Sequence, residues 1–185
     1  MIQFIQSIDF QILEFLRLIP KSDIMNNIMV FFTTLGDTGL LWIIGCFILM
    51  CFKKYRKIGI FCLIAISINF VIVSGILKPL ISRDRPFFYF PEMQLLINKP
   101  TDYSFPSGHA SIAFAAFSYL FSTKLKRFWI PALVVAIIIS FSRLYLYVHF
   151  PSDVLVGALI GLLSGFISFL IYKQYIKNSE KLSAN

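Results

Sequence analysis

Two histidines and a nearby aspartate are the residues of this chain best suited to chemistry. His109 and His149 are its only histidines, and Asp153 follows His149 by four residues. Side chains four residues apart can meet on one helical turn, so the Asp153 carboxylate can keep one nitrogen of the His149 imidazole protonated. The other nitrogen is then free to attack, and His109 can protonate the leaving group. The set predicts catalysis in which histidine itself is the nucleophile.

An anion site is expected beside these histidines. Ser107 is a good N-cap for a helix that begins at Gly108, where a ligand can approach the backbone N–H groups closely. Three cations are expected on the same face of the protein as the two histidines: Lys78, Arg85 and Arg143. Arginine can bind two phosphate oxygens at once. A phosphate group is therefore the expected ligand.

Each of these residues also has an ordinary structural explanation. Lys78 and Arg85 could anchor helices at the membrane interface, Arg143 could pair with an acid, and His109 could cap a helix. Their joint occurrence favours a single site over separate structural roles. Two histidines with one nearby carboxylate make a poor zinc or di-iron site, so we expect no metal and no cofactor.

The elements that hold these residues are expected to be membrane helices. Of the 185 residues, 58% are hydrophobic and 14% are charged, against about 45–50% and about 25% in soluble domains. Soluble, disordered and disulfide-scaffold classes are excluded on this basis. A membrane-crossing helix needs about 20 apolar residues. The expected spans cover residues 34–52, 58–77, 107–123, 128–148 and 154–172.

The N-terminal segment has a different pattern. Residues 2–19 place apolar side chains at helical spacing, which predicts an amphipathic helix that lies on the membrane. Residues 25–35 leave open a sixth crossing. The expected fold is an all-α, polytopic membrane helix bundle of five to six transmembrane helices with an N-terminal amphipathic helix. Its expected regions are an interfacial region at 1–33, a membrane domain at 34–173 and a cytoplasmic C-terminal tail at 174–185.

The basic residues predict the orientation of the bundle. If the five spans alternate, three basic clusters fall on one side, which is the cytoplasmic side by the positive-inside rule. The clusters are Lys53, Lys54, Arg56 and Lys57; Lys124, Lys126 and Arg127; and Lys173, Lys177 and Lys181. The two histidines then lie at the extracytoplasmic face of a multi-pass protein of the cell membrane. Topology accounts for most of the net charge of +8, so no nucleic-acid partner is expected.

Three further features of the chain carry structural expectations. Tyr145, Tyr147 and Phe150 are expected to form an interfacial aromatic belt. Gly157, Gly161 and Gly165, spaced by four, are expected at a helix-packing face. The linker 87–105 is either an interfacial lip that grips a lipid chain or a plain membrane anchor. The sequence assigns no role to Arg83 or Lys99 and no oligomeric state.

Three ordered motifs resemble the type 2 phosphatidic acid phosphatase superfamily. Residues 78–86 match its K-x6-R-P motif, residues 106–109 match P-S-G-H, and residues 142–153 match S-R-x5-H-x3-D. Every signature position is filled, and each motif lies at the outer end of an expected span. The resemblance covers residues 78–153 in motif and 34–172 in span pattern.

The resemblance implies a metal-independent membrane lipid phosphatase. His149 would form a phosphohistidine, Asp153 would orient it, and His109 would be the general acid that later helps to activate water. The remaining signature residues would bind the phosphate: Lys78, Arg85, Ser107, Gly108 and Arg143.

Several lipid phosphates are possible substrates. Bacterial relatives resembling this chain in length include undecaprenyl diphosphate phosphatases, phosphatidylglycerophosphate phosphatases and lipid A phosphatases. We expect undecaprenyl diphosphate, cleaved to undecaprenyl phosphate, with phosphatidylglycerophosphate, phosphatidate and lipid A as alternatives. One subgroup of the first enzymes carries Asp at the position of Gly108. A transporter or flippase that binds a lipid phosphate without cleaving it is the alternative from a different class.

Overall fold

The computed structural model describes residues 2–90, 92–123, 125 and 128–184, and over these ranges it contains helices and loops but no strand. The longer helices are α1 (Ile2–Leu18), α2 (Asp23–Gly36), α3 (Leu40–Cys51), α4 (Arg56–Phe70), α6 (Gly108–Ser122), α7 (Trp129–Tyr145) and α8 (Pro151–Ala184). The short ones are the 3-10 turns η1 (Asp37–Gly39) and η3 (Pro86–Phe88), the π-helical segment η2 (Val71–Leu77) and α5 (Lys78–Ile81). The expected all-α class is confirmed. Three residues of the expected basic clusters lie outside the described residues: Lys124, Lys126 and Arg127.

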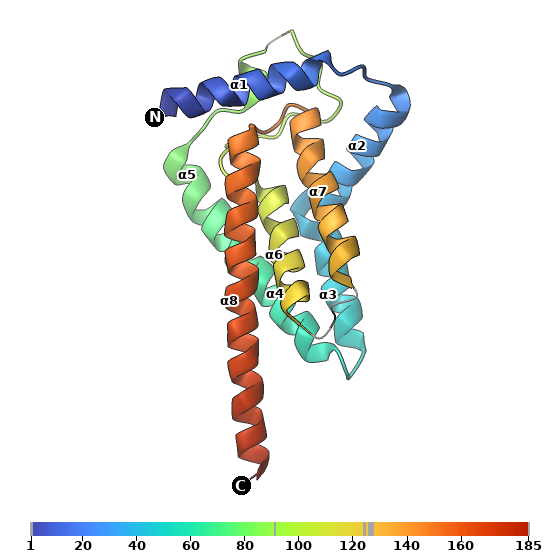
Figure 1. The fold of residues 1–185 in the computed structure, drawn as a ribbon, viewed down its shortest axis with the longest axis vertical. Coiled ribbons are helices and arrows are strands. Elements are labelled where there is room, and N and C mark those ends of the chain that lie inside the picture. The colour runs from blue at the N-terminus through green and yellow to red at the C-terminus, as the bar shows by residue number, and fades with distance from the viewer. Residues whose placement is uncertain (1, 91, 124, 126–127, 185) are drawn as a thin grey trace.

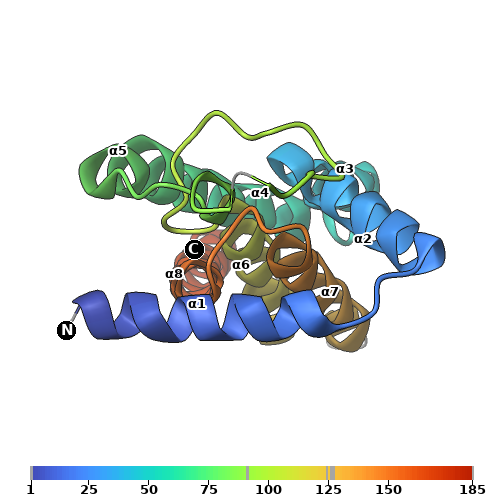
Figure 2. The same cartoon turned by 90° about the horizontal axis from the view of Figure 1, so that it is seen from above.

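Helix α6 occupies the centre of the bundle, with α3, α4, α7 and α8 around it (Figures 1 and 2). Helix α6 packs so closely against α8 that positions of α8 spaced by four residues have no room for a side chain. A Cβ atom on Gly161 would lie 2.2 Å from the Ser111 carbonyl oxygen, and one on Gly165 would lie 2.3 Å from the Ala115 carbonyl oxygen. Gly157 likewise faces the Ser107 backbone. The predicted packing role of these glycines is confirmed.

Three helical runs among the described residues are long and apolar enough to cross a membrane: Asp23–Cys51, Arg56–Phe88 and Pro151–Leu182. The first begins at Asp23 rather than at residue 34. The Ser22 hydroxyl accepts a hydrogen bond from the Met25 N–H and caps α2, while Asp37–Gly39 kinks the run without ending it. Helix α7 is apolar but shorter, with 17 residues, and α6 has 15.

Helix α1 lies across one end of the bundle, roughly perpendicular to α8 (Figures 1 and 2). One face buries Leu13 and Leu16, while Phe4 and Phe15 on the other face are largely exposed. The expected amphipathic helix is therefore present, with its inner face seated on the bundle.

The expected aromatic belt is wrong. Tyr145, Tyr147 and Phe150 are all almost fully buried. The Tyr147 hydroxyl donates a hydrogen bond to the Leu13 carbonyl oxygen (2.7 Å), and the Phe150 ring packs edge-on against Phe10. Tyr147 and Phe150 form the seat of α1, whereas Tyr145 packs with Met29 of α2 and donates to Asn26 Oδ1 (2.7 Å). The local sequence pattern could not indicate either contact.

Candidate active site

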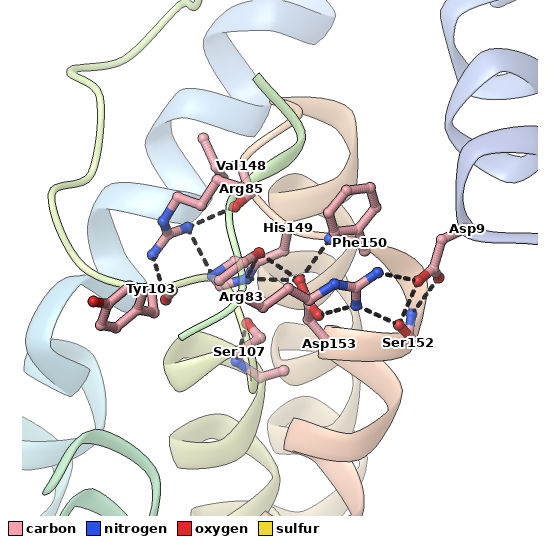
Figure 3. Close-up of polar contacts among 12 residues, drawn as sticks. Asp9, Arg83, Arg85, Tyr103, Ser107, Val148, His149, Phe150, Ser152 and Asp153 are labelled. Carbon is pink, nitrogen blue, oxygen red and sulfur yellow. Dashed lines mark hydrogen bonds and ion pairs between the residues drawn. The ribbon is translucent and has the colours of Figure 1, made fainter. Parts of the chain in front are cut away.

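The three motif segments meet at the end of the bundle that α1 covers (Figures 1 and 3). The Ser107 N–H donates to the Asp153 carbonyl oxygen (3.0 Å), which joins the start of α6 to the start of α8. The Val148 N–H donates to the Arg143 carbonyl oxygen (3.1 Å), so the chain after α7 folds back on the end of that helix. These backbone bonds hold residues that are far apart in sequence at one place.

A cavity of about 680 Å³ lies at this meeting point. Its lining includes most of the predicted site residues: Lys78, Arg85, Gly108, His109, Arg143 and His149. The two other predicted residues, Ser107 and Asp153, are fully buried. Ser107 caps α6, where its hydroxyl oxygen accepts from the Ala110 N–H (3.5 Å). The residues predicted from the sequence thus form one site.

The His149 ring is held in one orientation by groups on both of its nitrogens (Figure 3). Its Nδ1 atom lies 3.5 Å from Asp153 Oδ2 and 3.4 Å from Ser104 Oγ. Its Nε2 atom lies 3.2 Å from Nη1 of Arg85. Arginine can only donate hydrogen bonds, so Nε2 is the acceptor and the proton of the neutral imidazole is on Nδ1. This tautomer directs the Nε2 lone pair at Arg85, which lines the cavity together with His149.

The environment of His149 also favours its neutral form. The side chain is 1% exposed, and it lies in the short connection between α7 and α8. Burial lowers the pKa of His149 well below its usual value of 6.5, and the positive charges of Arg85, Arg143 and Lys78 lower it further. A neutral imidazole is the form that can act as a nucleophile.

Asp153 is fixed through both of its oxygens. Its Oδ2 accepts from the Ser104 hydroxyl (2.5 Å) and from the Phe150 N–H (2.9 Å), and its Oδ1 accepts from Arg83 Nη1 (2.5 Å). Sequence reasoning missed Ser104, whose hydroxyl contacts both Asp153 and His149. Its position in a loop outside the three motifs gave no signal of this contact.

A second residue missed by sequence reasoning is Asp102, which lies on two of the predicted phosphate ligands. Its carboxylate accepts from Lys78 Nζ through Oδ2 and from Arg85 Nη2 through Oδ1 (2.6 Å). Partial burial tends to raise the pKa of Asp102, but the hydrogen bond and charge of Lys78, followed by those of Arg85, lower it overall. An ionised carboxylate thus occupies two donors that phosphate oxygens are expected to use.

Arg143 retains a donor for an anion. The side chain is buried, and its Nη1 donates to Thr33 Oγ1. Among the described residues, its buried Nε has no hydrogen-bond partner. Because Arg143 lines the cavity, this guanidinium can bind a phosphate oxygen without first losing an acidic partner.

His109 also lines the cavity, at the first turn of α6. Its Nε2 atom lies 2.8 Å from Oδ1 of Asp37, a residue that the sequence indicated only as part of a kink. Gly36 makes room for the ring, because a Cβ atom there would lie 2.8 Å from His109 Cδ2. The junction of α2 and α3 therefore shapes the environment of the second histidine.

Comparisons with known proteins agree on one family. The profile described as the PAP2 superfamily matches residues 58–177. The chain is 38% identical to the undecaprenyl-diphosphatase of Sulfolobus acidocaldarius, over 89% of this chain and 78% of that protein. It is 28% identical to the lipid A 4'-phosphatase of Bacteroides thetaiotaomicron, over 92% of this chain and 80% of that protein. The crystal structure of a transmembrane PAP2-type phosphatidylglycerolphosphate phosphatase from Bacillus subtilis superposes with a TM-score of 0.73, at 28% identity, over 94% of this chain and 87% of that one.

Proposed function

The chain belongs to the PAP2 superfamily and is a membrane lipid phosphatase, and we propose that it cleaves its substrate through a phosphohistidine on His149. One observation carries this proposal. A buried, neutral imidazole has its Nδ1 on a fixed carboxylate and its Nε2 at a cavity wall that also carries Lys78, Arg85 and Arg143.

In the first step the phosphate oxygens accept hydrogen bonds from Lys78, Arg85 and Arg143, and the start of α6 adds backbone donors. The His149 Nε2 lone pair attacks phosphorus while the bond from phosphorus to the leaving oxygen breaks. His109 gives that oxygen a proton. Asp153 stabilises the positive charge that develops on the imidazole, through its contact with Nδ1.

In the second step water replaces the imidazole at phosphorus. His109, now deprotonated, accepts a proton from the attacking water as the nitrogen–phosphorus bond breaks. Inorganic phosphate leaves, and His149 returns to its neutral form. The three cations balance the charge on the phosphoryl oxygens in both steps, where electrostatic stabilisation is worth most.

The substrate we propose is undecaprenyl diphosphate, which would be converted to undecaprenyl phosphate. The name of the Sulfolobus relative supports it, and the names of the Bacteroides and Bacillus relatives keep lipid A and phosphatidylglycerophosphate as alternatives; phosphatidate is a further one. Val30 of α2 and Phe70 of α4, both on membrane helices, line the cavity, which suits a substrate with a hydrocarbon chain. Leu96 and Ile97 of the 87–105 linker also line it, in keeping with a lip over the lipid.

We further propose that the site faces the extracytoplasmic side. The connection between α3 and α4 and the C-terminal part of α8, which carry basic clusters, lie toward the end of the bundle opposite α1 (Figure 1). The positive-inside rule assigns that end to the cytoplasm. The same reasoning supports residues 174–185 as a cytoplasmic tail.

Trapping of the intermediate tests the proposal. We expect detergent-purified protein mixed with radiolabelled lipid diphosphate to yield an alkali-stable, acid-labile phosphoprotein that is absent from His149→Ala. Phosphate release should persist in chelator and be inhibited by vanadate. Wild-type rates in purified His149→Ala would rule out this nucleophile, and loss of activity in EDTA that magnesium restores would rule out the metal-free route. Substrate binding without phosphate release by the wild type would favour a transporter.

A further inference from the structure

Arg83 connects the N-terminal helix to the carboxylate that orients His149 (Figure 3). Its Nη1 atom donates to Asp153 Oδ1 (2.5 Å) and to Ser152 Oγ (2.8 Å). Its Nη2 atom donates to Asp9 Oδ2 (2.7 Å) and to Gln6 Oε1 (2.5 Å). Arg83 occupies an unspecified position of the first motif, and α1 lies outside all three motifs.

The Asp9 carboxylate is buried and fully hydrogen-bonded in this arrangement. Its side chain is buried, with 2% exposed, although it lies on a helix whose other face is open. The carboxylate also accepts from the Ser152 N–H (2.8 Å) and the Ser152 hydroxyl (2.5 Å), at the first turn of α8. Loss of these partners would leave a buried carboxylate unpaired, which would strongly destabilise the folded protein. Asp9 therefore ties α1 both to Arg83 and to the helix that carries Asp153.

Several independent contacts hold Arg83 in its position. The Phe150 ring lies under the guanidinium, with 4.1 Å between Cζ and the ring centroid. The Arg83 carbonyl oxygen accepts from the Ser104 N–H (2.8 Å), and the Ser104 hydroxyl in turn donates to Asp153 Oδ2. Arg83 thus supports Asp153 directly through its side chain and indirectly through Ser104.

The result is a row of alternating charges that ends at the nucleophile. Asp9 is negative, Arg83 positive and Asp153 negative, and Asp153 Oδ2 faces His149 Nδ1 while Oδ1 faces Arg83. Because each carboxylate oxygen of Asp153 has a separate partner, loss of Arg83 would free the carboxylate to rotate away from the imidazole. Loss of Asp9 would leave Arg83 paired with Asp153 alone.

We propose that Arg83, held by Asp9 of α1, is a positioning residue that fixes the Asp153 carboxylate against His149. Docking of the N-terminal helix then sets the reactivity of the nucleophile. The inference rests on the proposed role of His149.

Titration of His149 tests this coupling without activity. With only two histidines in the chain, nitrogen-15-histidine NMR of the detergent-purified protein can follow both rings. Arg83→Gln frees the Asp153 carboxylate to rotate away from Nδ1, so the pH at which His149 is half protonated should fall, whereas loss of the positive charge alone would raise it by about half a pH unit to one unit. Asp9→Asn removes a negative charge and loosens Arg83, so that midpoint should also fall. The double variant should titrate like Arg83→Gln, because Asp9 acts through Arg83.

The other charged groups around His149 are unsubstituted in all of these variants. They are Lys78 of α5, Arg85 of the following loop, Asp102 beside both, His109 of α6, Arg143 of α7 and Asp153 of α8. Glu14→Gln is the matched control, because it removes an exposed carboxylate from the same helix as Asp9. It should leave the midpoint unchanged.

Kinetics supply the second readout. We expect Arg83→Gln to lower kcat about tenfold or more with little change in KM, since Arg83 does not line the cavity, and Arg83→Lys to restore part of the loss. Unchanged midpoints, or a rise in Arg83→Gln with a fall in Asp9→Asn, would mean that Arg83 acts as a clamp or through its charge alone and would overturn the proposal. If a variant unfolds, the Arg83→Lys and double-variant midpoints still decide. A fall in both single variants together with full activity of His149→Ala would preserve the coupling but refute the proposed function.

Discussion

The Asp102 carboxylate forms an ion pair with Nη2 of Arg85 (2.6 Å), and Nη1 of the same guanidinium contacts His149 Nε2. Arg85 therefore contacts both an acidic loop residue and His149, the proposed nucleophile. Since phosphate is expected to bind the same guanidinium, substrate and Asp102 compete for it. This competition gives the first prediction.

Removal of the Asp102 charge should tighten anion binding. We expect Asp102→Asn to lower the inhibition constants of inorganic phosphate and vanadate several-fold, because Lys78 and Arg85 would no longer be neutralised by the loop. Asp84→Asn, which removes a neighbouring exposed carboxylate, is the control. Weaker phosphate inhibition in Asp102→Asn would mean that Asp102 organises the two cations instead of competing for them.

The rate losses caused by replacing the two histidines should depend differently on the leaving group of the substrate. His149→Ala should abolish turnover with every substrate, because no phosphohistidine forms. His109→Ala should lose about 10²–10⁴-fold with a lipid phosphate but much less with an aryl phosphate, whose leaving oxygen needs no proton. Rates with a matched pair of poor and good leaving groups measure this. Equal losses with both substrates would contradict the general-acid role.

On the acid side of the pH–rate profile, the rate should fall only at low pH. The proposed catalysis needs neutral His149, and its pKa in the folded protein is held well below 6.5 by burial and by the surrounding cations. The value of kcat/KM should therefore not drop as the pH falls through 6.5 and should drop only at lower pH. By the same linkage, the stability that depends on neutral His149 is present above 6.5 and is lost as the pH falls below it. A half-maximal rate near pH 6.5 would show that His149 is not buried as described.

A methyl group at Gly36 should disturb His109 specifically. Gly36→Ala places a Cβ atom against the His109 ring and the Ile139 side chain, so we expect the rate to fall toward that of His109→Ala. Gly45→Ala on α3 is the control, since nothing lies within 4 Å of a Cβ atom built there. The two variants can be compared by phosphate release and by melting temperature in detergent. Normal activity of Gly36→Ala would place the functional position of His109 elsewhere.

The sequence predicted the parts of the site that chain-local spacing controls. The Ser107 cap and the glycine face of α8 follow from helix geometry, and both are as expected. The four-residue spacing also brings His149 to Asp153, although His149 precedes the first turn of α8. Asp37, Asp102 and Ser104 were missed because each lies in a loop or kink whose approach to the site is set by tertiary packing.

The prediction for Tyr147 failed for a related reason. Its position at the end of an apolar helix is typical of an interfacial aromatic residue, but α1 covers it. The helical pattern of residues 2–19 correctly indicated one buried face, yet nothing in it identified what that face packs on. The start of the first long span at Asp23 was missed because the kink at Asp37–Gly39 resembled a boundary in sequence.

The seat of Asp9 has a consequence for how the protein is made. Helix α1 is synthesised before α8, but the Ser152 groups that bind its carboxylate belong to α8. Until α8 has been inserted, Asp9 can pair with Arg83 but lacks its two hydrogen bonds to Ser152. Docking of α1 is therefore completed only after α8 is in place, and an incompletely inserted chain leaves both Asp9 and Arg83 without part of their partners.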